Sequence, residues 1–109
     1  MLFDGNRPDE MEKQVYSEKY KYAGTIDQLY FDSWINDLKT GQPQPEHGLQ
    51  LSAYWLMCNP DITAKPWRLT CTYLHADGSI GEVVDYRYDP LAWLAMLTDY
   101  RWREKHGKL

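Results

Sequence analysis

The sequence has little cysteine, no long apolar run and none of the short motifs that mark common catalytic sites. Cys58 and Cys71 are too few for a disulfide framework, and neither has a histidine at metal-ligand spacing. The longest apolar run, Leu91 to Leu97, is seven residues, far short of a membrane span. The first residues are acidic where a secretory signal is basic. These absences predict a reduced cytoplasmic protein with no membrane segment, no metal and no cofactor.

Length and composition are those of one small globular unit. The chain has 109 residues, of which 43% are apolar and 26% charged, and its formal net charge is −4. That length suits one hydrophobic core, and the composition is too mixed for disorder. We therefore predict a single compact domain over residues 1–109, with 1–7 and 107–109 as flexible termini.

The first half of the chain gives two helical patterns and one alternating pattern. Pro8-Asp9-Glu10 favours a helix over 8–22, although Tyr16, Glu18, Tyr20 and Tyr22 alternate as in a strand. Thr25 to Gln28 has capping-box spacing, and Leu29, Trp34, Ile35 and Leu38 follow it at helical spacing. This pattern predicts a helix over 26–40. Alternation over 49–58 then predicts a strand.

The second half gives a hairpin followed by a helix. Asp77-Gly78 separates two alternating runs, which predicts a two-residue turn with Cys71 opposite Val84 and Tyr73 opposite Glu82. Asp89-Pro90 is a good helix start, and Gly107 a good helix end. We therefore predict a helix over 90–105.

These elements predict a two-layer α+β fold in the order α-α-β-β-β-α, a three-stranded antiparallel meander with two or three helices packed on it. The sequence of helix, three strands and helix resembles double-stranded RNA-binding domains in topology only. Those domains hold phosphates with lysines at the start of the last helix, and here that stretch is Asp89-Pro90-Leu91-Ala92-Trp93. The residues that would grip phosphate are missing from it.

Catalysis has only one weak candidate. The chain has no GxSxG, HExxH, GxxxxGK[ST] or GxGxxG motif. His75, Glu82, Tyr73 and Asp77 fall together in the predicted hairpin, so a base oriented by a carboxylate is geometrically possible there. Asp27, Asp32 and Asp37 spiral around the predicted helix 26–40, which favours a solvated acidic surface. We expect no catalytic residues, with a small His/Glu enzyme as the least favoured alternative.

Aromatic side chains are the most unusual feature. Five Trp, nine Tyr and two Phe are more than a core this small can bury, so several should face a partner. The candidate binding residues are Tyr54, Leu56, Arg68, Leu74, Val83, Arg87, Tyr88 and Trp102. They predict stoichiometric binding of another protein, basic if the acidic rim steers it, in the manner of an inhibitor, immunity factor or adaptor. A homodimer uses the same surface.

The alternative hypothesis is a nucleic-acid-binding module. The basic side chains available to it are Arg68 and Arg87 on the open sheet face and, in the tail, Arg101, Arg103, Lys105 and Lys108. Phosphate binding depends on local cations, and the net charge of −4 argues against it elsewhere on the surface.

Overall fold

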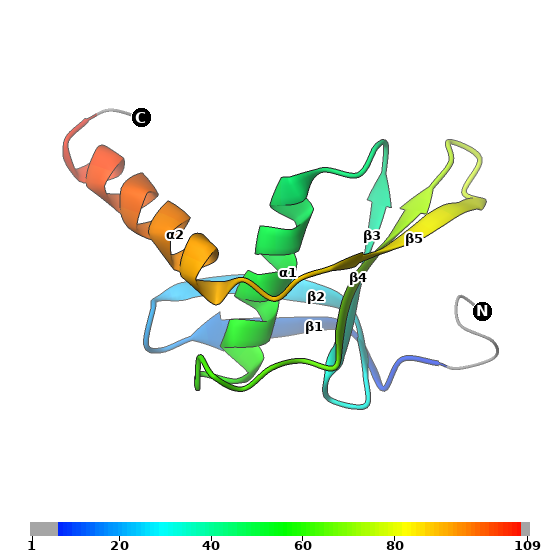
Figure 1. Cartoon of the computed structure of the whole chain (residues 1–109), viewed down its shortest axis with the longest axis horizontal. Helices are drawn as coiled ribbons and strands as arrows, with labels where there is room; N and C mark the ends of the chain where they lie inside the picture. Colours follow the sequence, from blue (N-terminus) through cyan, green and yellow to red (C-terminus); the bar gives the residue numbers. More distant parts are fainter. Residues whose placement is uncertain (1–6, 108–109) are drawn as a thin grey trace.

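The computed structural model describes residues 7–107. Seven elements follow one another: β1 (Glu10–Ser17), β2 (Tyr22–Tyr30), β3 (Trp34–Thr40), α1 (Pro45–Cys58), β4 (Arg68–Leu74), β5 (Ile80–Tyr86) and α2 (Pro90–Lys105). The five strands form one sheet in the order β1-β2-β3-β4-β5. Only β3 and β4 pair in parallel, and α1 connects them, so the fold is a two-layer α+β arrangement with a mixed sheet (Figure 1). The predicted three-stranded meander in the order α-α-β-β-β-α is wrong.

The segment predicted as a helix over 26–40 is the end of β2, a tight turn and β3. Phe31 and Asp32 at the turn both have positive φ, of 54° and 57°, and the Ser33 amide donates to the Tyr30 carbonyl at 3.0 Å. Two positive φ values define a type I′ hairpin turn, which Asn-Gly or Asp-Gly usually supplies. Both strands have residues buried on each face, so their apolar side chains run together in sequence and imitate helical spacing.

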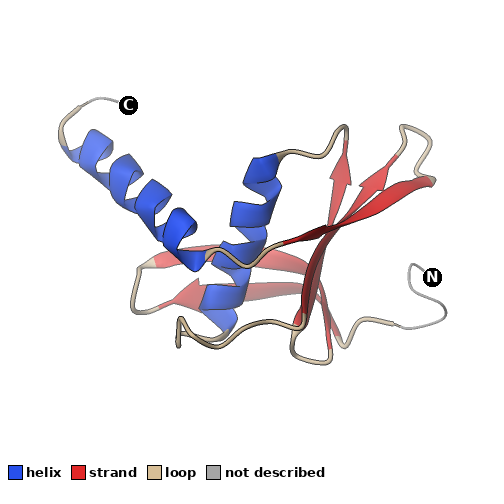
Figure 2. Cartoon of the chain, in the orientation of Figure 1, coloured by secondary structure: helices blue, strands red, loops and turns tan. Residues whose placement is uncertain are grey.

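The other two predictions in this half are also wrong. Residues 8–22 hold β1 and the turn into β2, with Lys13, Val15 and Ser17 covered in strand alternation. Residues 49–58 belong to α1 (Figure 2). This helix contacts all five strands, and seven of its 14 residues are buried. Because apolar and buried residues extend around much of the helix, the sequence carries only a weak period-3.6 signal.

The second half confirms the sequence prediction in most details. Cys71 pairs with Val84 and Tyr73 with Glu82, as the hairpin register requires. The register shifts at Leu74, which pairs with Ile80, because the loop from His75 to Ser79 is longer than two residues. Helix α2 spans Pro90–Lys105 as predicted.

The core lies between α1 and the sheet. Its buried cluster comprises Ile26, Leu29, Ile35, Leu51, Trp55, Leu69, Cys71 and Tyr73. Helix α2 buries no residue and extends away from the body beside α1 (Figure 1). Neither helix of the described chain is long and apolar enough to cross a membrane. The termini predicted to be flexible fall almost entirely outside the described residues.

Candidate active site

Strand β3 carries two charged side chains on its α1 face. Asp37 and Lys39 are two residues apart, so alternation places them on the same face as the core residue Ile35. Asp37 is only 4% exposed. The Lys39 Nζ lies 2.8 Å from its Oδ2 atom. A buried carboxylate with a cation beside it is therefore built into the centre of the fold.

A second carboxylate reaches this position from β2. Asp27 Oδ2 accepts a hydrogen bond from the Leu38 amide at 2.9 Å, just beyond the last residues that pair β2 with β3. This bond holds the Asp27 carboxylate against the chain between Asp37 and Lys39. Burial, followed by a hydrogen bond with Asp27, raises the pKa of Asp37 to about 6, and Lys39 offsets only part of that shift. The two carboxyl groups therefore share one small site.

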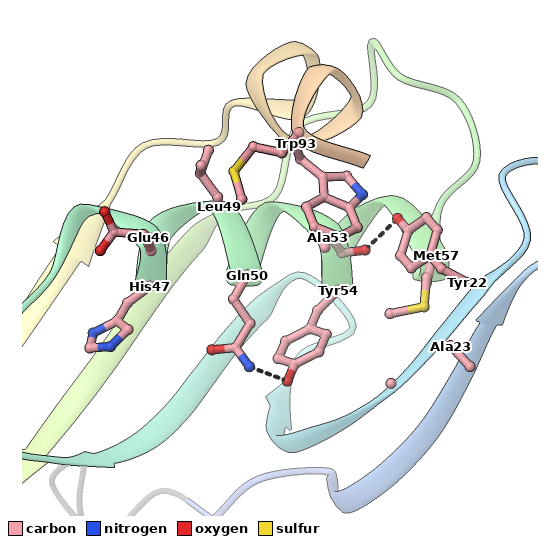
Figure 3. A pocket seen from close by; sticks show the side chains of 12 residues that line it. Tyr22, Ala23, Glu46, His47, Leu49, Gln50, Ala53, Tyr54, Met57 and Trp93 are labelled. Atoms are coloured by element: carbon pink, nitrogen blue, oxygen red, sulfur yellow. Dashed lines mark hydrogen bonds between the residues drawn. The ribbon is translucent and has the colours of Figure 1, made fainter. Parts of the chain in front are cut away.

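Helix α1 completes the cluster with two polar residues one turn apart. Gln50 Oε1 accepts a hydrogen bond from Lys39 Nζ at 2.5 Å. Gln50 Nε2 donates to the Tyr54 hydroxyl at 2.8 Å, as Figure 3 shows. The spacing of four residues places both on one side of the helix. Burial raises the pKa of Tyr54 to about 12, so its hydroxyl stays protonated. Gln50 and Tyr54 thus fix the position of the Lys39 ammonium.

A second hydrogen-bonded chain flanks Lys39 on its other side. His47 Nδ1 lies 2.7 Å from the Tyr73 hydroxyl, and that hydroxyl bonds to the hydroxyl of Tyr86. Burial, with a smaller contribution from Lys39, lowers the pKa of His47. Burial also raises the pKa of Tyr73. Burial therefore favours the uncharged forms of His47 and Tyr73, beside the basic side chain of Lys39.

An apolar pocket of about 440 Å³ lies next to this cluster, between α1, β2 and the start of α2. Gln50 and Tyr54 form its wall toward the carboxylates, and Tyr22 and Trp93 form the opposite wall (Figure 3). The rings of Tyr22 and Trp93 meet edge to face with centroids 5.2 Å apart. Asp27, Asp37 and Lys39 do not line the pocket. It is a neighbouring cavity, separated from the charged groups by the Gln50–Tyr54 pair.

The predicted binding residues are dispersed. Tyr54 and Leu56 lie on α1, where Leu56 is 1% exposed, instead of on an open sheet face with Leu74 and Val83. Trp102 lies on α2 and is 55% exposed. Three of them, Arg68, Arg87 and Tyr88, line one pocket at the start of β4. The other members lie on three parts of the fold: α1, the β4–β5 hairpin and α2.

Three residues of the hairpin alternative, Tyr73, His75 and Glu82, line one pocket at the end of β4. Within residues 7–107, His75 and Glu82 share no hydrogen bond or ion pair, and the Tyr73 hydroxyl is committed to α1 and β5. The described chain also has no group of three or more His, Cys, Asp or Glu side chains able to hold a metal ion. A cation site here therefore depends on two carboxylates.

Sequence reasoning missed this cluster because it placed Asp27 and Asp37 on a solvated helix. Two signals were available in the residues. Asp37-Leu38-Lys39 puts an acid and a base on one face if the segment is a strand. Gln50 and Tyr54 lie on one face if residues 45–58 form a helix. Both signals depend on an element type that the sequence pattern misassigned.

Comparison with known proteins shows a similarity to solved structures in fold. No family model matches the chain, and no curated protein matches its sequence. Its fold is similar to that of a crystal structure named "Putative exonuclease" from Eubacterium rectale, with a TM-score of 0.64 and 13% identity. The match covers 92% of this chain and 46% of that one, so this chain spans about half its length. At such identity the likeness shows the fold alone.

Proposed function

We propose that this protein hydrolyses phosphodiester bonds of nucleic acid with the help of a divalent cation. The observation that carries the proposal is the meeting of Asp27 and Asp37 from adjacent strands, with the Lys39 ammonium 2.8 Å from Asp37. In the reaction, water adds to phosphorus and the bond from phosphorus to one ester oxygen breaks. The products are a phosphate monoester and a free hydroxyl.

The carboxylates suit a hard divalent cation. Mg²⁺ is commonly held by one or two carboxylates, with waters and substrate phosphate oxygens as its other ligands, so a larger cage is not required. Asp37 has a raised pKa because it is buried beside another carboxyl group. A cation held by Asp27 and Asp37 would relieve that repulsion. When bound, such an ion polarises a phosphoryl oxygen and helps to ionise water.

Lys39 is proposed to bind the substrate phosphate, while the two carboxylates hold the cation. Its ammonium is a compact charge that can contact a non-bridging phosphate oxygen and stabilise the charge that develops in the transition state. Gln50 holds this ammonium in place and Tyr54 holds Gln50, so the lysine loses little freedom when substrate arrives. We assign Asp27, Asp37 and Lys39 as catalytic residues, and Gln50 and Tyr54 as positioning residues.

Two considerations favour nucleic acid over a small phosphate ester. The structural likeness is to part of a protein named "Putative exonuclease", which supports the proposal by analogy. The sheet also carries a second basic and aromatic pocket away from the carboxylates, as an extended polymeric substrate would use.

The proposal is tested by incubating labelled single-stranded and duplex DNA with the protein and Mg²⁺ or Mn²⁺. We expect cleavage that EDTA abolishes and that falls roughly 100-fold or more in Asp37→Asn and Lys39→Ala. Asp99→Asn, an exposed acid on α2, is the matched control and should cleave normally. Cleavage that persists in EDTA or in Asp37→Asn, or no cleavage of any nucleic acid, would rule the assignment out.

A second proposal follows from α2, which leaves large apolar side chains uncovered. Leu91, Met96, Tyr100 and Trp102 are 71%, 46%, 53% and 55% exposed. Patches of this kind support binding of another protein or of a second copy of the chain. Light scattering over a concentration series distinguishes these two, since only self-association raises the mass. The double variant Tyr100→Ala with Trp102→Ala should lose whichever partner the wild type retains.

A further inference from the structure

A second pocket, of about 400 Å³, opens at the start of β4. This end of the strand is the one opposite to Lys39, which pairs with Tyr73. Cationic and aromatic side chains dominate its lining: Lys65, Trp67, Arg68, Tyr86, Arg87 and Tyr88. None of the lining residues is acidic. On a chain whose net charge is −4, this concentration of positive charge is local.

Two of the three cations have no ionic partner. Arg68 forms a two-point contact with Asp85, with distances of 2.9 Å and 3.0 Å. Lys65 and Arg87 are exposed, and neither has an ion pair with another residue of the 7–107 segment. Arg87, just after β5, and Lys65, in the connection that precedes β4, line the same opening. The pocket therefore offers two free positive charges to an anion.

Trp67 supplies a fixed aromatic surface between them. Its side chain is 62% exposed, yet its ring meets Trp34 edge to face with centroids 5.5 Å apart, and the Arg68 guanidinium lies 5.9 Å from its centre. Arg68 also lies 4.8 Å from the ring centre of Trp34, which ties the group together. An indole that is held in place and open to solvent loses little entropy when a flat ligand stacks on it.

We propose that this pocket binds one nucleotide of an unpaired nucleic-acid strand, with the base stacked on Trp67 and its phosphates between Lys65 and Arg87. The inference rests on the proposed function, because the bound nucleic-acid strand would be the substrate of the proposed hydrolysis. Stacking of this kind needs an unpaired base, because a duplex hides the base faces. A small molecule with only a phosphate or only a ring would use half of the pocket.

The pair of rings formed by Trp34 and Trp67 lies on the face of β3 opposite to Asp37, because side chains alternate along a strand. Arg68 pairs with Trp34, and Asp37 lies three residues farther along the same strand. At ~3.3 Å per residue this is roughly 10 Å. A nucleic-acid strand held in the pocket would therefore have to pass around the end of the sheet to reach the carboxylates.

The test is fluorescence anisotropy with a labelled oligothymidylate of about 12 nucleotides. The protein is the Asp37→Asn variant in EDTA, so binding is measured without cleavage. Adding Trp67→Ala should weaken binding roughly fivefold or more, while adding Trp67→Phe should restore most of it. Adding Arg87→Ala should weaken binding and reduce its salt dependence. Adding Tyr16→Ala, an aromatic side chain on β1 that is 50% exposed, is the control and should change nothing.

The outcomes separate the two proposals. Undiminished binding by the Trp67→Ala protein, or equal affinity for a duplex of the same length, would overturn the pocket assignment whatever the cleavage result. Circular dichroism shows whether Trp67→Ala has kept its fold, and Trp67→Phe gives the answer if it has not. Binding that depends on Trp67, in a protein that cuts no nucleic acid, would support the pocket while the proposed hydrolase fails.

Discussion

The ionised form of Asp37 lowers the stability of the folded protein, because its carboxylate is buried. Asp37 is 4% exposed and sits beside Asp27, and burial followed by that neighbour raises its pKa from 3.8 to about 6. The folded protein therefore binds this proton more tightly than the unfolded chain does. Stability should fall as pH rises from about 4 to about 6, and stay lower above that range. Residues retained against stability in this way are characteristic of functional sites.

The first prediction is that Asp37→Asn stabilises the protein at pH 7 while it removes activity. Asparagine has the same shape and no charge to desolvate, so we expect a gain of about 1 to 3 kcal/mol in the free energy of unfolding. Urea denaturation at pH 7 and at pH 4 measures it. The gain should largely vanish at pH 4, where Asp37 is protonated in the folded protein. A loss of stability at both pH values would contradict the description of this site.

The second prediction concerns the binding of Mg²⁺ and pH. A cation must displace the proton from Asp37, whose pKa is about 6, so affinity should fall as pH drops through that value. Below pH 6 the decline should be about tenfold per pH unit for one displaced proton. Thermal shift titrations with MgCl₂ at several pH values test this. Asp37→Asn should show neither the shift nor its pH dependence, and a pH-independent shift in the wild type would place the ion elsewhere.

At the scale of elements, α2 depends on its own ends more than on packing. The Asp89 side chain accepts a hydrogen bond from the Ala92 amide at 3.2 Å, which caps the first turn of a helix that buries no residue. Asp99 and Arg103, by contrast, form an exposed i,i+4 ion pair at 3.1 Å. We therefore expect Asp89 to contribute more than Asp99 to the stability of α2.

The third prediction compares them directly. Asp89→Ala should lose about 1 kcal/mol of helix stability, because it leaves an amide of the first turn without an acceptor. Asp99→Ala should lose at most about 0.5 kcal/mol, since exposed pairs are screened by solvent. Ellipticity at the helical minimum during thermal melting measures both. Equal effects would mean that the cap contributes nothing beyond a surface charge.

The fourth prediction concerns Gly48, where α1 crosses β5. A Cβ atom added there would lie 2.8 Å from Tyr86 Cδ1 and 3.3 Å from its Cβ, near the root of a side chain that cannot swing aside. Alanine favours helices over glycine by about 1 kcal/mol, so an unhindered Gly48→Ala would stabilise. We expect a net loss of about 1 to 3 kcal/mol from overpacking instead, seen as a lower urea midpoint. A higher midpoint would show that α1 and β5 separate easily.

The elements also show what the sequence can predict. The β4–β5 register and the bounds of α2 followed from local turn and cap residues, which act over a few positions. The secondary structure of residues 8–58 was predicted wrongly because the burial of its side chains depends on tertiary structure. Strands β2 and β3 have buried residues on both faces, and α1 packs against the sheet. The turn at Phe31 and Asp32 lacks glycine, so it gave no warning. The candidate site was missed for the same reason, because Asp27, Asp37 and Gln50 come together only when β2, β3 and α1 have the correct types and order.

At the scale of the whole molecule, charge sets a limit on how the protein binds nucleic acid. A net charge of −4 repels phosphate over most of the surface, so attraction must come from the few cations near the two sites. Lys39, Lys65 and Arg87 are the candidates that the geometry provides. Binding should therefore be weaker and less salt-dependent than for a protein with a basic face.

The fifth prediction turns this into a measurable slope. Three phosphate contacts on a single strand give a slope of about −2 for log K against log salt, at about 0.7 per contact. Arg87→Ala in the Asp37→Asn protein should flatten the slope by about 0.7, whereas Arg103→Ala on the far part of α2 should leave it unchanged. Anisotropy titrations between low and moderate salt give the slope directly. A steep slope that Arg103→Ala reduces would mean that the basic end of α2 holds the nucleic acid. The assignment of binding to the pocket at the start of β4 would then be wrong.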